Sequence, residues 1–321
     1  MRKIVTLTVN PAIDKSTFIE GIKPFNKLRC QESTYEPGGG GINVSKVLKE
    51  LGGTSLCMYM AGGPTGTHLK EMLADLDILQ QLIPIAGRVR ENLSVTDTLN
   101  NQTYRFGMPG PTVMENEWKN VLGHLEAILL EGDILVASGS ICSGMPTNFF
   151  AQVAKIAHEK KVKYILDTNG EALVKGAEAG VYLLKPNLGE LATLCGVQTI
   201  PFLELESMAK AYLQNNPCEL MIVSLGAQGA VMVTKEQVEY IAAPIVYRKN
   251  NNRAGDSMVA GMVFAMTQGK TISEMAQYGV ACGTAAIMTE GSQPCRIKDV
   301  EELYQWIQAN SLNSGKIKIN A

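Results

Sequence analysis

The chain begins with an unbroken run of apolar and β-branched side chains at 4–9, which Asn10 and Pro11 bring to an end. Such runs are typical of strands that are buried on both faces of a sheet. Apolar runs of the same type recur at 54–60, 133–138, 163–167, 181–184 and 219–224. Apolar positions at helical spacing separate most of them. This alternation predicts an α/β fold with a mostly parallel sheet covered by helices on both faces.

Two segments depart from this alternation, at about 15–36 and 91–108. Both mix apolar and polar positions with turn-forming residues. The second predicts a hairpin, since two strand-like stretches flank Asn100 and Asn101. Together the two inserts predict a small β-sheet that forms a lid over one end of the main sheet. We find no internal repeat and no linker, so 1–321 is expected to form one domain that ends in a loose polar tail.

The composition is that of a compact globule with many tight turns, because 45% of the residues are hydrophobic, 19% are charged and 31 are glycines. The 29 basic and 31 acidic residues leave a net charge of −2. No overall field therefore attracts nucleic acid or an anionic membrane, and we expect neither as a partner. An anionic small molecule would have to be held by local groups.

Cysteine spacing and the length of apolar runs bear on where the protein works. The seven cysteines are scattered and none stands in C-x-x-C spacing, which favours reduced thiols over disulfides or a zinc site. The N-terminal apolar run has the length of a strand and not of a signal peptide. No apolar run is long enough to span a membrane. We therefore expect a cytoplasmic protein.

Four consecutive glycines, from Gly38 to Gly41, precede a predicted helix whose first turn holds Asn43. Glycine lets the backbone approach a ligand closely, and a helix N-terminus favours polar or anionic groups. The amide of Asn43 offers both a donor and an acceptor to a hydroxylated ligand. A flexible loop followed by a helix cap explains the same residues about equally well.

Charged side chains gather in and beside the predicted lid. Asp14 follows the first strand, at the carboxyl edge where α/β sheets bind ligands, although an ordinary turn aspartate would look the same. Four basic residues are found here: Lys27, Arg29, Arg90 and Arg105. A single basic residue at such a place is usually a solvated surface position. Four on one lid indicate a phosphate-bearing substrate.

Two later loops follow strands and have two interpretations each. Lys185, Asn187 and Glu190 lie where the strand at 181–184 gives way to a helix. Asn187 and Glu190 have capping-box spacing, and the alternative is that the segment binds nucleotide phosphates and magnesium. Spacing alone does not separate these two. The loop at 224–230 matches no known phosphate-loop spacing, which favours a hairpin connection over a nucleotide-binding loop.

The turn from Arg253 to Asp256 opens an apolar helical run near the C-terminus. Small residues before a helix expose backbone N–H groups to a phosphate, and a first-turn aspartate can act as a base beside it. Asp256 can also be explained as a partner of the helix dipole. Arg253 is unexpected, because a large cation stands where such a loop favours a small residue. His68, His124 and His158 are expected on helix surfaces, and no G-x-S-x-G or H-E-x-x-H motif offers another chemistry.

Four motifs, G-G-G-G-I-N, K-P-N-x-x-E, S-L-G-x-x-G and A-G-D-S, resemble in this order the PfkB family of sugar kinases, which have a ribokinase-like fold. The likeness extends from Val5 to beyond Gly283. The four glycines are most similar to those of the minor 6-phosphofructokinases of bacteria. The resemblance implies a kinase that uses ATP and Mg²⁺ to phosphorylate a hexose phosphate. Fructose 6-phosphate is the first expectation, with fructose 1-phosphate and tagatose 6-phosphate as alternatives.

The resemblance also implies a role for each matching residue. Asp256 would be the general base, with N–H groups of Ala254 and Gly255 in the anion hole. The sugar would be held by Asp14, Gly39, Gly40 and Asn43, and its phosphate by Lys27, Arg29, Arg90 and Arg105. ATP would face Lys185, Asn187, Ser224, Gly226 and Gly229, and Glu190 would serve magnesium. The lid would form the interface of a homodimer.

Arg253 departs from the family pattern, because it replaces a glycine whose N–H belongs to the anion hole, and Asn251 replaces a threonine. Arginine keeps that N–H in place only where the local φ and ψ tolerate a Cβ. Its guanidinium would block the space of the γ-phosphate or act as a cation on the transferring group. Together with the asparagine run at 250–252, this leaves a catalytically impaired sensor of sugar phosphate or nucleotide as an alternative. A kinase of an unphosphorylated sugar or nucleoside is a third, if the basic lid residues are incidental.

Overall fold

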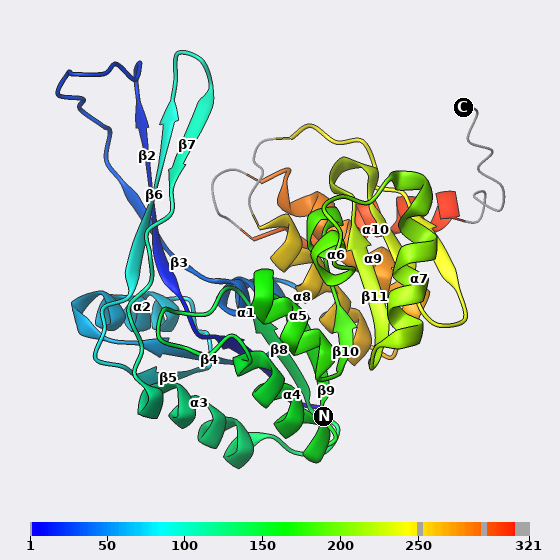
Figure 1. Ribbon diagram of the computed structural model, residues 1–321. Coiled ribbons are helices and arrows are strands. Elements are labelled where there is room, and N and C mark those ends of the chain that lie inside the picture. The colour runs from blue at the N-terminus through cyan, green and yellow to red at the C-terminus, as the bar shows by residue number, and fades with distance from the viewer. Residues whose placement is uncertain (1, 249–252, 290–293, 312–321) are drawn as a thin grey trace.

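The computed structural model describes residues 2–248, 253–289 and 294–311 (Figure 1). The asparagine run at 250–252 and the predicted tail beyond 311 lie outside these residues. In the described part of the chain the strands form two separate sheets, one large and one small. The large sheet and its helices make up the main body of the molecule.

The strands of the large sheet are β1 (Ile4–Thr8), β4 (Leu56–Ala61), β5 (Gln80–Pro84), β8 (Ile134–Ser138), β9 (Lys163–Asp167), β10 (Val181–Leu184), β11 (Cys218–Ser224), β12 (Ala230–Val233) and β13 (Val238–Ile241). Their spatial order is β13-β12-β11-β10-β9-β8-β1-β4-β5. All neighbours from β5 to β11 are parallel, whereas β11, β12 and β13 pair antiparallel. The predicted mostly parallel sheet is confirmed.

Two strands, β5 and β13, were not predicted from the sequence pattern, and β12 was expected only as the second strand of a hairpin after β11. β5 and β13 are short edge strands with mixed burial, so their apolar signal is weak. β12 forms a hairpin with β11 across the glycine-containing loop, and this confirms the hairpin prediction for 224–230. A short 3₁₀ turn, Gly226–Gln228, lies within that loop.

Helices cover both faces of the large sheet, as predicted. One face packs against α3 (Glu115–Ile128), α4 (Phe149–Glu159), α5 (Gly170–Glu178), α6 (Leu188–Leu194) and α7 (Leu205–Asn215). The other face packs against α1 (Gly40–Glu50), α8 (Ala254–Thr267), α9 (Ile272–Ala286) and α10 (Ile297–Ser311). α2 (Gly63–Asp75) packs against β4 in a third apolar cluster. None of the described helices is long and apolar enough to cross a bilayer.

The small sheet contains β2 (Ala12–Ile19), β3 (Thr34–Gly38), β6 (Arg90–Asp97) and β7 (Gln102–Phe106), in the order β3-β2-β6-β7. It is built from the two inserts that break the alternating pattern, although β2 and β6 begin slightly earlier than predicted. Figure 1 shows its blue and cyan strands rising away from the main body. Phe18, Tyr35 and Phe106 are exposed on it.

The carboxyl ends of the parallel strands place the polar residues of the site. Because β1, β8, β9, β10 and β11 are parallel, their carboxyl ends share one edge of the sheet. Ser138 and Asp167 end two of these strands, and Lys185 directly follows a third. β2 leaves the same edge and carries Asp14 into the small sheet.

Candidate active site

The glycine run brings the start of α1 directly onto the carboxyl ends of two strands. Gly39 has a φ of 121°, which favours glycine. A Cβ on Gly40 would stand 2.1 Å from Ser138 Oγ, and one on Gly41 would stand 2.7 Å from the carbonyl oxygen of Leu7. No larger residue fits at these two positions without a shift of the backbone. The glycines therefore have a packing role, whatever ligand they also face.

Asp256 lies in the first turn of α8 and is held by side chains from two other elements. Asn43 of α1 donates from Nδ2 to Asp256 Oδ2 at 2.8 Å, and the Ser138 hydroxyl lies 3.4 Å from Oδ1. Loss of hydration and the nearby Asp167 carboxylate raise the pKa of Asp256 from 3.8 to about 6. The Asn43 hydrogen bond and the charges of Lys185 and Arg253 oppose this rise.

A buried ion pair lies beside this turn. Lys185 Nζ is 3.2 Å from Asp167 Oδ1, and a Cβ on Gly255 would stand 3.3 Å from the same nitrogen. Burial disfavours the charged ammonium, but Asp167 and Glu190 outweigh it and raise the pKa of Lys185 above its ordinary value. Asp167 was not predicted as a site residue. It ends a predicted strand at the carboxyl edge, so the reasoning applied to Asp14 would have found it.

Arg253 is the N-cap of α8 and keeps the left-handed conformation of a glycine, with φ 61° and ψ 8°. Its Nη2 donates to Asp14 Oδ2 and its Nη1 to Glu36 Oε2, both at 2.9 Å. Lys46 of α1 lies 3.3 Å from the same Glu36 oxygen. The guanidinium therefore binds carboxylates of the small sheet. From the sequence it was expected either to block the space of the γ-phosphate or to act as a cation on the transferring group, and these contacts agree with neither.

A cavity of about 270 Å³ opens between the small sheet and the main body. Its polar lining includes Asp14, Ser16, Asn43, Asn92, Arg105 and Arg253. Asn92 also donates to Asp14 Oδ1 at 2.9 Å. Carboxylate, amide, hydroxyl and guanidinium groups together suit a small hydroxylated molecule that carries an anionic group. We call this cavity the polar cavity.

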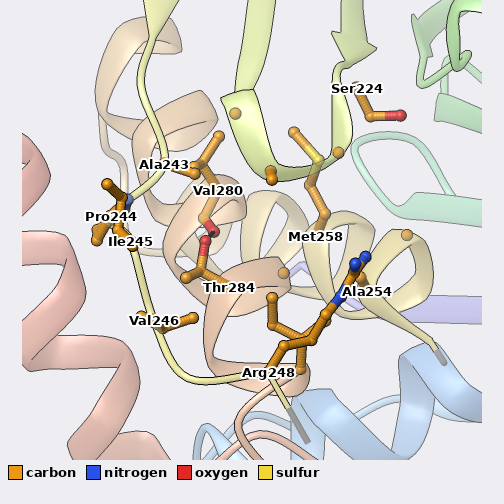
Figure 2. Close-up of a pocket in the computed structure, with 16 residues that line it drawn as sticks. Ser224, Ala243, Pro244, Ile245, Val246, Arg248, Ala254, Met258, Val280 and Thr284 are labelled. Atoms are coloured by element: carbon orange, nitrogen blue, oxygen red, sulfur yellow. Dashed lines mark hydrogen bonds between the residues drawn. The ribbon is translucent and has the colours of Figure 1, made fainter. Parts of the chain in front are cut away.

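A second pocket, of about 260 Å³, lies on the other side of the α8 N-terminus. Figure 2 shows Ala254 and Met258 of α8 together with Val280 and Thr284 of α9, facing the segment from Ala243 to Arg248. Its lining also includes Ser224, Gly226, Gly229 and Gly255. The walls are largely apolar, and the amide end of a helix opens into it, which suits a flat apolar group joined to an anion. We call it the apolar pocket.

Asp256 itself lines neither space, but residues next to it line both. Asn43, which donates to its carboxylate, lines the polar cavity. Ala254 and Gly255, which directly precede it, line the apolar pocket. A proton acceptor in this position is placed to act on a group bound in one space while an anion is bound in the other.

Some of the residues predicted to bind the sugar phosphate line neither the polar cavity nor the apolar pocket. Of the four basic residues, Arg105 alone lines the polar cavity in the described chain. Lys27 and Arg29 are exposed in the loop between β2 and β3. Arg90 donates to the carbonyl oxygens of Asn10 and Met108, at 3.1 and 3.2 Å, so its guanidinium contacts the backbone at the base of the small sheet.

The capping interpretation of Asn187 and Glu190 is confirmed. The Asn187 side chain accepts from the Glu190 amide and Glu190 Oε2 accepts from the Asn187 amide, each at 2.9 Å. The Ser224 amide donates to the Pro186 carbonyl at 2.9 Å, so the loops at 185–190 and 224–230 lie side by side. The histidines lie within α2, α3 and α4 as expected.

The chain matches the pfkB family of carbohydrate kinases over residues 5–299. It is 34% identical to the ATP-dependent 6-phosphofructokinase isozyme 2 of Escherichia coli over 96% of this chain and 99% of that one. It is 31% identical to the 1-phosphofructokinase of Bacillus subtilis over 89% and 93%. The crystal structure of Escherichia coli phosphofructokinase-2 in complex with fructose-6-phosphate has a TM-score of 0.90 at 33% identity, covering 96% of this chain and 100% of that one.

These similarities extend over the large sheet, both helical layers and the small sheet, because the matched structures are covered almost completely. The kinases they name act on phosphorylated sugars. The chain therefore belongs to the pfkB family of carbohydrate kinases, phosphotransferases that act on a sugar hydroxyl, and has the ribokinase-like fold that its motifs predict.

Proposed function

We propose that this chain is an ATP-dependent kinase of a hexose phosphate, with fructose 6-phosphate as the first candidate acceptor and Asp256 as the general base. The observation that carries the proposal is that Asp256 is hydrogen-bonded to Asn43, which lines the polar cavity, and directly follows Gly255, which lines the apolar pocket. The Escherichia coli and Bacillus subtilis relatives support a phosphorylated fructose as acceptor. Fructose 1-phosphate and tagatose 6-phosphate are the next candidates, since relatives also bear those activities in their names.

In this proposal the sugar occupies the polar cavity. Asp14 and Asn43 bind its hydroxyl groups beside the backbone of Gly39 and Gly40, and Arg105 binds its phosphate. Asn43 Oδ1 is buried and has no hydrogen-bond partner among the described residues, so a sugar hydroxyl would satisfy it.

We further propose one kinase domain whose small sheet is the lid, and a homodimer formed through that lid. Lys27 and Arg29 lie in an exposed loop and do not reach the polar cavity of their own chain. Exposed apolar side chains on the same sheet, Phe18, Tyr35 and Phe106, favour contact with another protein surface. In a dimer, the two basic residues would bind the sugar phosphate of a partner subunit.

The apolar pocket would hold ATP. Its apolar side chains suit the adenine ring, while Ser224, Gly226 and Gly229 border it with little bulk. Backbone N–H groups of Ala254 and Gly255 at the start of α8 face the phosphates. The Lys185 ammonium lies beside Gly255 at this end of the pocket, and Asn187 pairs with Ser224, which also lines it.

In the transfer step, the Asp256 carboxylate accepts the proton of the sugar hydroxyl as that oxygen bonds to the terminal phosphorus of ATP. The bond from this phosphorus to the bridging oxygen breaks, and ADP leaves. A pKa of about 6 leaves Asp256 ionised at neutral pH and still more basic than an ordinary aspartate.

Mg²⁺ would accompany ATP and neutralise charge on its phosphates. Among the described residues no three His, Cys, Asp or Glu side chains gather as a metal cage, so the phosphates and water must supply most of its ligands. Glu190 fits a role through water, because the hydrogen bond from the Asn187 amide uses only its Oε2. Its own charge would then orient the bound water.

The conformation of Arg253 supports a working kinase over an impaired sensor. Because φ is 61°, the backbone keeps the turn that a glycine would adopt, with the Ser257 amide donating to the Arg253 carbonyl at 2.9 Å. The guanidinium points to Asp14 and Glu36, so it is not in the apolar pocket. These contacts support the proposal that the space of the transferring phosphoryl group stays open.

A coupled assay for ADP tests the proposal. Purified protein is supplied with ATP, Mg²⁺ and, in turn, fructose 6-phosphate, fructose 1-phosphate, tagatose 6-phosphate and unphosphorylated fructose. Turnover with one of the phosphorylated sugars is expected, and no ADP above the background of Asp256→Asn with any of them would contradict the proposal. Arg105→Met should raise KM for the sugar phosphate; an unchanged KM would favour an unphosphorylated acceptor.

A further inference from the structure

Arg253 joins the small sheet to the first turn of α8 through its side chain. Its two terminal nitrogens donate to Asp14 of β2 and Glu36 of β3, each at 2.9 Å. Asp14 and Glu36 are direct register partners in the small sheet, so one guanidinium spans a pair of neighbouring strands. The Arg253 side chain is only 12% exposed, which protects both ion pairs from solvent screening.

The backbone of Arg253 makes this arrangement unusual. Its φ of 61° lies in the region that glycine adopts freely and that a side chain with a Cβ disfavours. A residue in such a conformation persists where its surroundings hold it there. The N-cap side chain makes no capping hydrogen bond to α8, so the contacts that hold it include the two carboxylates of the small sheet.

Glu36 also contacts the main body at another point. Lys46 of α1 lies 3.3 Å from the oxygen that accepts from Arg253. Burial and the charge of Arg253 lower the pKa of Lys46 to about 8, although Glu36 opposes this. Glu36 thus connects the small sheet to α1 and to the N-terminus of α8, the two helices whose first turns hold Asn43 and Asp256.

We propose that Arg253 is a positioning residue that clamps the small sheet to the N-terminus of α8 and so fixes Asp14 in the polar cavity before the acceptor binds. The inference rests on the proposed function only in taking the polar cavity as the acceptor site. A guanidinium that contacts two paired carboxylates sets the angle of the sheet as well as its distance. A lysine, which is a point charge on a flexible stem, would not do both.

The clamp predicts a particular split between kinetic constants. Arg253→Gly removes both ion pairs but suits the left-handed turn, so the anion-binding backbone stays in place. Asp14 then keeps the hydrogen bond from Asn92 but loses the one from Arg253, and KM for the sugar phosphate should rise about 10- to 100-fold, while KM for ATP stays within about threefold. Arg253→Lys should give an intermediate KM. A cation that acted on the transferring phosphoryl group would instead lower kcat, and a fall in kcat with unchanged KM would overturn the proposal.

Glu36→Gln tests the same clamp from the other side. It should raise KM for the sugar phosphate less than Arg253→Gly does, because it removes only the Arg253–Glu36 ion pair. The double variant should be no worse than Arg253→Gly alone, since Arg253→Gly already removes that pair. Glu91→Gln is the matched control, because Glu91 is an exposed carboxylate on β6 of the same sheet. Additive effects of the two clamp substitutions, or an equal effect of Glu91→Gln, would contradict a specific clamp.

Hydrogen–deuterium exchange of the full-length protein without ligands separates this inference from the proposed function. Arg253→Gly and Glu36→Gln should speed exchange in the peptides that cover 12–19 and 34–38, with Arg253→Lys in between and Glu91→Gln at the wild-type rate. This measurement needs no turnover, so it decides the clamp even if no sugar phosphate is phosphorylated. Unchanged exchange in both segments of Arg253→Gly would overturn it.

Discussion

Asn43 Nδ2 donates a 2.8 Å hydrogen bond to Asp256 Oδ2, which joins the first turns of α1 and α8 across 213 residues of sequence. The bond orients the Asn43 amide, whose Oδ1 is buried and has no hydrogen-bond partner among the described residues. It also favours the ionised form of Asp256 against the loss of hydration that raises its pKa. One side chain therefore serves both the sugar hydroxyls and the base in the proposed mechanism.

Asp256→Asn should lower kcat by about 10²–10⁴-fold, because an amide does not accept the hydroxyl proton. Binding of fructose 6-phosphate, measured by calorimetry, should stay close to wild type. The exposed Asp75→Asn on α2 is a control that should leave kcat unchanged. A rate near wild type in Asp256→Asn would remove Asp256 from the role of base.

The same substitution should change stability with pH. Since the folded pKa of Asp256 is about 6 and its ordinary value is 3.8, its ionisation destabilises the fold progressively as pH rises between these values. Asp256→Asn should therefore raise Tm by a few degrees at pH 7.5 and by much less near pH 4. A Tm difference that does not depend on pH would contradict the raised pKa.

The rate of the wild-type protein should fall on the acidic side of pH 6, where Asp256 becomes protonated. Below this pH, kcat/KM should drop about tenfold per pH unit. The phosphate of the acceptor sugar also titrates near pH 6, which changes acceptor binding over the same pH range. Binding of the acceptor to Asp256→Asn measures this effect separately, so that it can be subtracted from the rate profile. A corrected profile that is flat between pH 5 and 7 would argue against this base.

Asn43→Ala should move that acidic limb to higher pH, because it removes the hydrogen bond that stabilises the Asp256 carboxylate. Asn92→Ala is a matched control in the same cavity, since Asn92 donates to Asp14 and not to Asp256. The control should raise KM for the sugar and leave the limb in place. Equal shifts in both variants would show that the cavity as a whole, and not the Asn43 bond, sets the pKa.

The convergence of Asp14, Asn43 and Asp256 could be predicted because it depends on backbone topology. Parallel strands bring their carboxyl ends to one edge, and glycine-rich turns start helices there. The same reasoning applies to Asp167, which ends a predicted strand, and it was missed only because a single aspartate matches no motif. The capping box of Glu190 likewise depends on neighbours three residues apart, so its spacing indicated the cap, although it left a role at the nucleotide equally open.

The partners of Arg253 could not be predicted from the sequence. Asp14 and Glu36 lie 239 and 217 residues away, and the guanidinium reaches them through its rotamer and the tilt of the small sheet. Lys27 and Arg29 were placed correctly in the insert that forms the small sheet, but both are exposed. The sequence pattern that identifies such an insert does not show which of its charged side chains face the cavity. Local patterns determine elements and edges, whereas pairs of long side chains depend on tertiary packing.

Gly40→Ala should destabilise the protein by about 1–3 kcal/mol, because its Cβ would stand 2.1 Å from Ser138 Oγ and 2.7 Å from the Ser138 carbonyl carbon. Gly123→Ala is the control, since Gly123 lies within α3 with no atom near the position of a Cβ. That control should stabilise by about 0.5–1 kcal/mol. Urea unfolding measures both, and equal effects would show that α1 is not closely packed on β8.

Glu190→Gln separates the two roles that Glu190 can have. Glutamine accepts the Asn187 amide as glutamate does, so the capping box should survive and the free energy of unfolding should change by less than about 0.5 kcal/mol. The negative charge is lost, and a carboxylate that serves Mg²⁺ through water loses its function with it. The Mg²⁺ concentration for half-maximal rate should then rise several-fold at fixed ATP.

Glu190→Ala completes this comparison, because it removes the cap and the charge together. It should show the same Mg²⁺ dependence as Glu190→Gln and, in addition, a loss of about 0.5–2 kcal/mol in stability. Since only residues 185–187 separate β10 from α6, loosening the first turn of α6 would also displace Lys185, which lies beside Gly255. Another outcome is that Glu190→Gln keeps the wild-type Mg²⁺ dependence while Glu190→Ala loses activity and stability together. Glu190 would then act on the site only by holding Lys185 and the start of α6 in place.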